Sequence, residues 1–216
     1  MEKLRKRAPY WPLHVAKAIR LGASLDEIYD ATGIDKYFLY VIKDIVELEE
    51  TIREKARQRE LDTSLLKQAK EYGFSDKQIA MIIGKSEQEV RAYRLSNKLR
   101  PGVKQIDTLA AEWPASTNYL YMTYNSMSDD IPYSNKTDNE KILVLGAGVF
   151  RIGVSVEFDW AVVNFAKAAR RRGYKTIVLN YNPETVSTDW DMNEKLYFEE
   201  ITLERVLDIV DHEKPI

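Results

Sequence analysis

A glycine-rich turn in the second half of the chain combines residue types that could bind an anion or a small polar substrate. It lies in the stretch ILVLGAGVFRIGVSVEFDW, residues 142–160. The glycines of this loop are Gly146, Gly148 and Gly153. After a strand, such glycines allow backbone N–H groups at the start of a helix to face an anion. Arg151 adds a permanent cation and Glu157 a carboxylate, so the turn is a candidate ligand site.

The loop departs from the fingerprint of a dinucleotide-binding protein. That fingerprint requires the pattern GxGxxG and an acidic residue about 20 positions further on, which holds the ribose. Arg151 stands in place of the third glycine, and the next strand-like run ends in Asn180 rather than in an acid. Two carboxylates, Glu157 and Asp159, also follow the loop, and they disfavour a simple phosphate cradle. A free-standing nicotinamide-dependent oxidoreductase is therefore disfavoured.

A second carboxylate falls at the same edge of the predicted sheet. Glu184 follows the strand-like run KTIVLN, within the segment NPET. In a right-handed βαβ unit both Glu157 and Glu184 then lie at the carboxyl edge of the parallel strands, where ligand sites form. Two explanations stay open from the residues alone: a polar site between the carboxylates, or solvent-facing acids, with Glu157 favourably placed at the positive end of a helix. Neither residue is assigned a catalytic role.

The elements that position these residues alternate in type after residue 140. Strand-like runs (KILVL, KTIVLN and KLYFEE) alternate with helical patterns over residues 156–172 and 203–210. This alternation is typical of βαβ units and a parallel sheet. We predict an α/β domain over residues 141–216, built on a parallel sheet.

Helical periodicity dominates residues 1–125, and we predict no strand there. One five-residue pattern occurs twice with identical spacing, as Gly22, Ser24, Glu27, Ile28 and Gly33 and again as Gly73, Ser75, Gln78, Ile79 and Gly84. Each copy predicts a helix that begins at a serine capping box and ends at a left-handed glycine. Residues 126–140 are rich in turn-forming residues and indicate a linker. The predicted fold class is an all-helical domain followed by the α/β domain.

The second copy of the pattern also fits a DNA-binding motif. A further cap at Ser86 opens a helix with several basic residues in or just after it: Arg91, Arg94, Lys98 and Arg100. A helix, a tight turn and a basic helix are typical of a DNA-reading helix-turn-helix. Helical hairpins with a glycine turn are also common in bundles, and charged residues usually form a solvated face. A DNA-binding regulator with an α/β sensor domain stays open as the alternative.

The composition argues against other function classes. The chain has 216 residues, no cysteine and a net charge of −2, so it has neither disulfides nor a thiolate metal site. His14 and His212 are far apart and lack a ligand pattern, and we predict no metal site. No apolar run approaches the roughly 20 residues of a membrane span, and the charge does not indicate a nucleic-acid partner. We expect a cytoplasmic protein without a membrane or nucleic-acid partner.

Several motifs carry a resemblance to a known family. RIGVSVEFDW, NPETVSTD and LYFEE occur in this order, and this part resembles the pre-ATP-grasp domain that opens the second half of the carbamoyl-phosphate synthase large subunit. GIDKYFLYVIKDIVELEE, FSDKQIA and VKQIDTLAAEW resemble that subunit's oligomerization domain. The resemblance covers residues 10–214. One departure is the glycine loop, which is GAGVFRIG here and commonly closer to GGGPNRIG in bacteria.

The resemblance implies a ligase that makes carbamoyl phosphate for arginine and pyrimidine synthesis. Its substrates would be bicarbonate, two ATP and ammonia, which a glutamine amidotransferase small subunit releases from glutamine. Carbamate made in the first half passes through a tunnel to the second half. The glutamates that match Glu157 and Glu184 line the end of this tunnel in the family, and Arg151 would lie near them.

The resemblance also implies that the α/β domain over residues 141–216 is an incomplete doubly wound parallel sheet, truncated at its C-terminus, and it limits what this chain can do by itself. ATP and its Mg or Mn ions would be bound mainly by an ATP-grasp domain that follows residue 216 in the family. We therefore expect no cofactor and no catalytic residue within the chain, which alone should be inactive. The remaining segments of the large subunit would be its partners, and residues 1–125 would mediate self-association.

Overall fold

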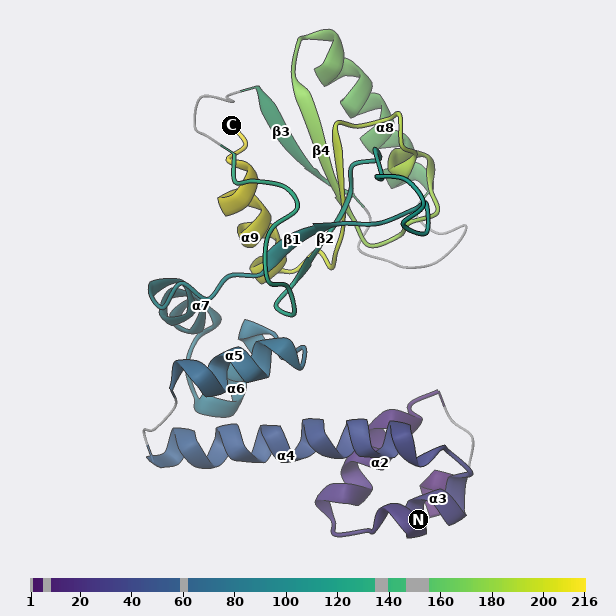
Figure 1. Cartoon of the computed structure of the whole chain (residues 1–216), viewed down its shortest axis with the longest axis vertical. Coiled ribbons are helices and arrows are strands. Elements are labelled where there is room, and N and C mark those ends of the chain that lie inside the picture. Colours follow the sequence, from purple (N-terminus) through teal and green to yellow (C-terminus); the bar gives the residue numbers. More distant parts are fainter. Residues whose placement is uncertain (1, 6–8, 59–61, 135–139, 147–155) are drawn as a thin grey trace. The chain divides into compact units, whose positions relative to one another are not determined.

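The computed structural model describes residues 2–5, 9–58, 62–134, 140–146 and 156–216. The chain divides into two compact units, Met1–Asn97 and Lys98–Ile216, whose helices and strands are labelled in Figure 1. Among the described residues, no helix has both the length and the apolar character that a membrane span requires. Three residues of the candidate glycine loop, Gly148, Arg151 and Gly153, lie outside the described residues.

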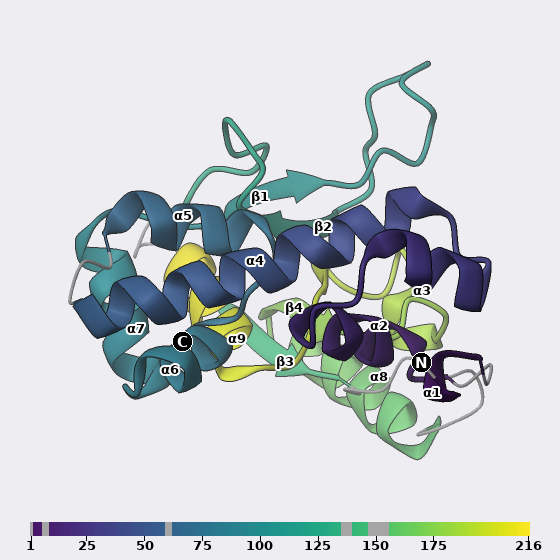
Figure 2. The same ribbon diagram turned by 90° about the horizontal axis from the view of Figure 1, so that it is seen from below.

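The first unit is helical. Its elements are α1 (Glu2–Arg5), α2 (Trp11–Arg20), α3 (Leu25–Thr32), α4 (Lys36–Gln58), α5 (Thr63–Glu71), α6 (Asp76–Ile83) and α7 (Glu87–Ser96). Figures 1 and 2 show α2 and α3 along one end of the long helix α4. Val15, Ile28 and Leu39, from these three helices, form a fully buried core there. Helix α6 packs against α4 as well.

The repeated capping pattern of the helical unit is confirmed. The Ser24 and Ser75 hydroxyls each accept the backbone N–H three residues on, and Glu27 and Gln78 each accept the N–H of the capping serine. A third capping box, at Ser86, opens α7. Gly33 and Gly84 end α3 and α6 with φ values of 68° and 70°, a left-handed conformation that glycine adopts without steric cost.

The second unit is a five-stranded sheet with helices on both faces. The strands are β1 (Gly102–Gln105), β2 (Tyr119–Thr123), β3 (Lys141–Leu145), β4 (Lys175–Asn180) and β5 (Lys195–Phe198), in the order β1-β2-β5-β4-β3. Only β1 pairs antiparallel, with β2; the other three pairs are parallel. The remaining elements are α8 (Val156–Arg171), the 3₁₀ helix η1 (Val186–Thr188) and α9 (Leu203–Glu213).

The alternation of side chains along β4 explains the two covered faces. Val178 packs with Val162 of α8 on one face, whereas Ile177 packs with Ile209 of α9 on the other. Figure 1 shows α8 and α9 on opposite sides of the strands. A strand buried on both faces is the hallmark of a doubly wound sheet, so the predicted fold class, helical followed by α/β, is confirmed.

The expectation of helices throughout residues 1–125 does not hold for β1 and β2. These strands cover residues 102–105 and 119–123 and belong to the α/β unit. Strand β2 shows the period-2 alternation of a strand, because Leu120 and Met122 are buried while Tyr121 is exposed. Strands of four and five residues carry too short a pattern to compete with helical spacing. Their conformation is decided by pairing, of β2 with β5 and of β1 with β2.

Residues 126–134 do not form the free linker that their composition indicated. The Asp129 carboxylate accepts the N–H of Val103 at 2.7 Å, and Asp130 accepts the N–H of Gln105 at 3.0 Å. Strand β1 lies at an edge of the sheet, so these N–H groups have no strand partner, and the two aspartates satisfy them. Ile131 packs against the core beneath. Residues 135–139 of the predicted linker lie outside the described part of the chain.

The C-terminal end of α9 carries a buried polar cluster. Glu213 is fully buried and accepts hydrogen bonds from Lys195 at 2.9 Å and from Tyr197 at 2.6 Å. Next to it, the ring of His212 lies 4.3 Å from the ring of Tyr133. His212 is fully buried, and neither of its ring nitrogens has a hydrogen-bond partner among the described residues. A protonated His212 would therefore be costly at this position.

We expect His212 to make the α/β unit sensitive to mild acid. Burial lowers the pKa of His212 below its ordinary value of 6.5. The negative charges of Glu213 and Asp129 act against this shift, and the positive charges of Lys195 and Lys141 add to it. The unfolded chain therefore binds the proton first, and the free energy of unfolding is greatest above about pH 6.5 and falls below it. His212→Phe should remove much of this fall, because phenylalanine does not titrate.

Urea unfolding between pH 7.5 and about pH 5.5, the range in which an ordinary histidine titrates, tests this prediction. Amide hydrogen exchange of β4 and β5, which pair with each other in the sheet, reports on the α/β unit separately from the helical unit. An equal loss of stability in His212→Phe and in the parent chain would contradict the assignment to His212.

The carboxyl edge of the parallel sheet

The two carboxylates singled out by the sequence lie on neighbouring elements at the carboxyl edge of the sheet. Glu157 is in the first turn of α8, and Glu184 lies in the loop between β4 and η1. Both side chains are exposed. Helix α8 packs against η1, so the structure brings together the two segments that carry them. Asp159 in the same turn of α8 is half-buried.

Two buried asparagines hold the NPET turn that carries Glu184. The Asn180 Oδ1 accepts the N–H of Asn182 at 3.0 Å, and the Asn182 Oδ1 accepts the N–H of Glu184 at 3.0 Å. Asn180 and Asn182 are 1% and 5% exposed, so solvent does not compete for these bonds. Asn180, which excluded a dinucleotide site in the sequence, has a structural task here: it fixes the backbone of this turn.

The hydroxyl groups of Thr188 and Ser187 hold the second half of the loop by hydrogen bonds. The Thr188 Oγ1 lies 2.9 Å from the carbonyl oxygen of Pro183 and 2.7 Å from that of Thr185. The Ser187 Oγ lies 3.3 Å from the Asn180 Nδ2, and the Ser187 N–H donates to the Asp159 Oδ1 at 3.0 Å. The loop is therefore bonded both to the strand before it and to α8.

Gly146 has a packing reason to be glycine. Its N–H donates to the carbonyl oxygen of Leu179 at 2.8 Å. A Cβ atom at this position would lie 2.8 Å from the Asn180 Nδ2, so any side chain would displace the asparagine that holds the NPET turn. The first glycine of the predicted loop thus supports the loop after β4.

Glu199 is a further carboxylate at this edge, which the sequence patterns did not single out. It directly follows β5 and accepts the N–H of Met122 at 2.6 Å, and the Arg205 Nε lies 3.2 Å from its other oxygen. Burial raises the pKa of Glu199, against the lowering effect of Arg205. The sequence signal that could have identified Glu199 is the position of an acid directly after a buried strand. Because its oxygens are engaged by β2 and α9, Glu199 ties these elements together.

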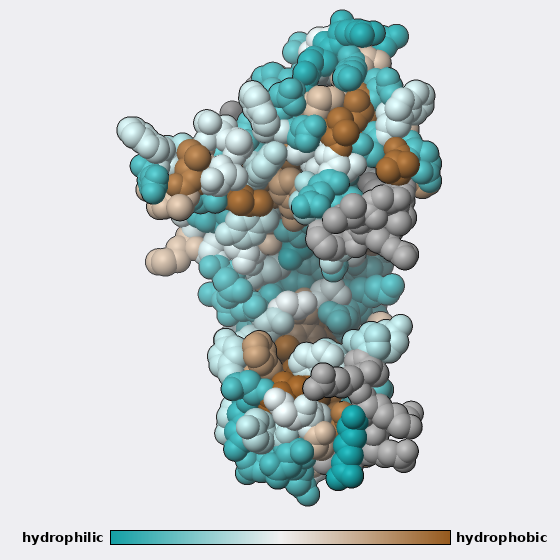
Figure 3. All heavy atoms as spheres, turned by 90° about the vertical axis from the view of Figure 1, so that its right-hand side faces the viewer, coloured by the Kyte–Doolittle hydropathy of each residue, from teal (hydrophilic) through white to brown (hydrophobic). Residues whose placement is uncertain are grey.

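Large apolar side chains surround the edge. The exposed ones are Val156, Phe158, Trp160, Tyr181, Val186 and Trp190. Figure 3, which looks onto the α8 side, shows hydrophobic side chains at the surface of this unit. Clusters of exposed apolar residues are typical of interaction surfaces and ligand-binding grooves. No group of three or more His, Asp or Glu residues suited to a metal ion occurs in the described parts of the chain.

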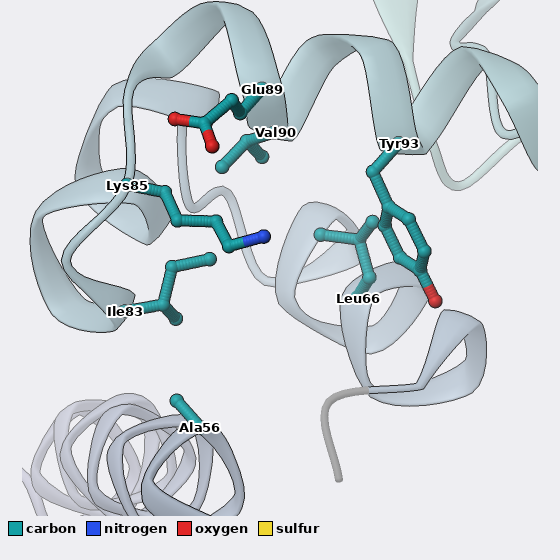
Figure 4. A pocket seen from close by; sticks show the side chains of 7 residues that line it. All are labelled: Ala56, Leu66, Ile83, Lys85, Glu89, Val90 and Tyr93. Carbon is teal, nitrogen blue, oxygen red and sulfur yellow. The ribbon is translucent and has the colours of Figure 1, made fainter. Parts of the chain in front are cut away.

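The helical unit has a cavity of its own, with a volume of about 370 Å³. Figure 4 shows its lining, from helices α4 to α7 and the turn between α6 and α7: Ala56, Leu66, Ile83, Lys85, Glu89, Val90 and Tyr93. The Glu89 carboxylate is engaged in the capping box of α7, 2.9 Å from the Ser86 N. The lining combines apolar side chains with the charged groups of Lys85 and Glu89, and the Lys85 side chain points into the cavity (Figure 4).

The helix-turn-helix formed by α6 and α7 does not present all of its basic residues to solvent. Arg94 is fully buried, and its Nη2 lies 2.9 Å from the Asp76 Oδ2. Lys70 is buried on the same carboxylate, at 3.0 Å. Arg94 therefore belongs to the core of the helical unit, and the DNA-binding alternative loses one of the charges on which it depended.

The second unit is thus a doubly wound α/β domain, and it follows a separate helical unit. At the carboxyl edge of its sheet, a loop carries ordered amides and carboxylates. Comparison with known families agrees with both parts. Residues 1–98 match the family described as "Carbamoyl-phosphate synthetase large chain, oligomerisation domain". Residues 138–216 match the "Carbamoyl phosphate synthase preATP-grasp domain".

Individual relatives lead to the same family. The chain is 58% identical to the carbamoyl phosphate synthase large chain of Hyperthermus butylicus, over 99% of this chain and 20% of that protein. It is 53% identical to that of Pyrococcus furiosus, over 100% of this chain and 19% of that protein. It is 51% identical to the "Carbamoyl-phosphate synthase [ammonia], mitochondrial" of Rattus norvegicus, over 92% of this chain and 13% of that protein. The chain belongs to the carbamoyl phosphate synthase large-chain family.

The resemblance drawn from the sequence motifs is thereby confirmed. The chain spans about a fifth of the length of the archaeal relatives named above. It is a segment of a larger large chain, with an oligomerisation domain and a pre-ATP-grasp domain.

Proposed function

We propose that this segment serves the synthesis of carbamoyl phosphate by lining part of a passage for carbamate. The observation that carries the proposal is the fixed geometry of the carboxyl edge. Glu157 and Glu184 lie on two packed segments, and buried amides hold the turn that carries Glu184. Both carboxylates are exposed.

The chemistry of carbamate explains why such an edge is useful. Carbamate decomposes quickly in water, so its passage must exclude bulk solvent and offer a few ordered polar groups. Carboxylates fixed on a rigid frame can hold ordered water, and Arg151, a cation of the glycine loop that precedes α8 in the sequence, would attract the anion. The exposed apolar residues around the edge, among them Phe158 and Trp160, would be covered by other segments of the large chain. The role is guidance and not bond-making.

The complete enzyme would supply the remaining chemistry. ATP and its Mg or Mn ions would be bound by other domains of the large chain, and a glutamine amidotransferase small chain would provide ammonia. The reaction would be a ligation driven by two ATP, and its location would be the cytoplasm. We assign none of the described residues to bond-making in it, and the isolated chain should not form carbamoyl phosphate.

We further propose that the helical unit mediates self-association, as the description of its matching family suggests. Exposed apolar residues at the start of α4 support a contact surface there: Tyr37, Phe38, Tyr40 and Val41. Burial of such side chains between copies would stabilise an oligomer. In sedimentation equilibrium, the weight-average mass of the chain should rise above the monomer mass as concentration increases. A strict monomer up to the solubility limit would contradict self-association.

A further inference from the structure

The side chain of Asp159 bonds the first turn of α8 to the loop after β4. Its Oδ1 accepts the backbone N–H of Ser187, 28 positions further along the chain, at 3.0 Å. Ser187 is fully buried, and Asp159 is half-buried. A hydrogen bond with a charged acceptor contributes more than one between neutral groups. This contact therefore sets the position of η1 against the start of α8.

The bond to Ser187 continues into the turn that carries Glu184. The Ser187 Oγ lies 3.3 Å from the Asn180 Nδ2, and the Oδ1 of the same amide accepts the N–H of Asn182. The amide of Asn182 in turn accepts the N–H of Glu184. A continuous chain of buried and part-buried hydrogen bonds thus connects Asp159 with the backbone of Glu184. Glu157 stands two residues before Asp159 on the same helix.

Helix α8 has a second, independent bond to the segment after η1. At the opposite end of the helix, the Arg170 Nη2 donates to the carbonyl oxygens of Asp191, at 3.2 Å, and of Met192, at 2.5 Å. Loss of the Asp159 contact would leave this attachment in place. The loop would stay on the helix, but the end that carries Glu184 would be loosened.

We propose that Asp159 is a positioning residue for carbamate transfer, which holds the turn bearing Glu184 in register with the helix bearing Glu157. This inference rests on the proposed passage. Asp159 touches no reacting atom in this role; it acts through the backbone of Ser187 on the two glutamates. The role requires an oxygen acceptor at this position; the negative charge strengthens the bond but does not define its geometry.

The test uses a full-length large chain that carries this segment, with ammonia as the nitrogen source. Carbamoyl phosphate formed per ATP consumed should fall severalfold in Asp159→Ala, while bicarbonate-dependent ATP hydrolysis persists. Asp159→Asn keeps an acceptor oxygen at the Oδ1 position and should restore the ratio. A role limited to stability would lower both activities together and would not alter the ratio. Thermal unfolding of each variant verifies that the comparison is made on folded protein.

Arg170→Ala is the matched control, because it removes the attachment at the other end of α8. Its ratio should stay at the wild-type value. A wild-type ratio in Asp159→Ala, or an equal fall in Arg170→Ala, would overturn the positioning role. If Glu157→Ala and Glu184→Ala lower the ratio but Asp159→Ala does not, only the positioning role is lost. If the glutamate variants leave the ratio unchanged, the passage itself is refuted, and the positioning role with it.

Discussion

Replacing Glu157 or Glu184 by alanine in a full-length large chain should uncouple ATP consumption from carbamoyl phosphate formation. Both carboxylates are exposed at the carboxyl edge of the sheet, on segments that pack against each other. Removing one takes away a polar group that would order water in the passage, so carbamate would escape or decompose before phosphorylation. We expect a severalfold fall in carbamoyl phosphate formed per ATP, with bicarbonate-dependent ATP hydrolysis largely intact.

Glu194 offers a matched control for this experiment. It is an exposed acid directly before β5, and therefore at the amino edge of the same sheet, away from the proposed passage. Glu194→Ala should leave the ratio at the wild-type value. Wild-type ratios in both Glu157→Ala and Glu184→Ala would remove the passage role, and the explanation as solvent-facing acids would stand. Neither substitution should alter the melting temperature much, because exposed positions tolerate such changes.

The largest expected effect on stability comes from the buried charges of the helical unit. Asp76 is fully buried between Lys70, at 3.0 Å, and Arg94, at 2.9 Å. Asp76→Ala leaves these two cations without their shared carboxylate in a low-dielectric interior. Breaking a buried pair in this way typically costs about 3 to 5 kcal/mol of unfolding free energy. Urea unfolding followed by far-ultraviolet circular dichroism measures it, since most helices belong to this unit.

The contrast with an exposed pair makes this prediction specific. Asp26 pairs with Lys36 on the surface of the same unit, where its side chain is 77% exposed. Surface ion pairs contribute little, so Asp26→Ala should unfold at nearly the wild-type urea concentration. Asp76→Asn should fall between Asp76→Ala and wild type, because the amide oxygen can still accept a bond. Similar unfolding midpoints for Asp76→Ala and Asp26→Ala would contradict the importance of the buried charges.

Several features could be predicted from the sequence because they depend on neighbours along the chain. The capping boxes at Ser24 and Ser75 and the left-handed glycines that end these helices use contacts only a few residues apart. The alternation of strands and helices after residue 140 predicted the doubly wound sheet, since connection rules leave few other arrangements. The same rules placed Glu157 and Glu184 at one edge, and the long motifs identified the family.

Other features depended on contacts between distant parts of the chain. The burial of Arg94 is decided by Asp76, and the packing of residues 126–134 by the unpaired N–H groups of β1. The bond between Asp159 and Ser187 joins segments that no local pattern relates. The sequence by itself determined the caps, the α/β alternation and the family, because local geometry and residue spacing carry them. Only the tertiary structure decided which charges are buried and which carboxylates are engaged in hydrogen bonds and ion pairs, because burial and pairing arise when separate elements pack.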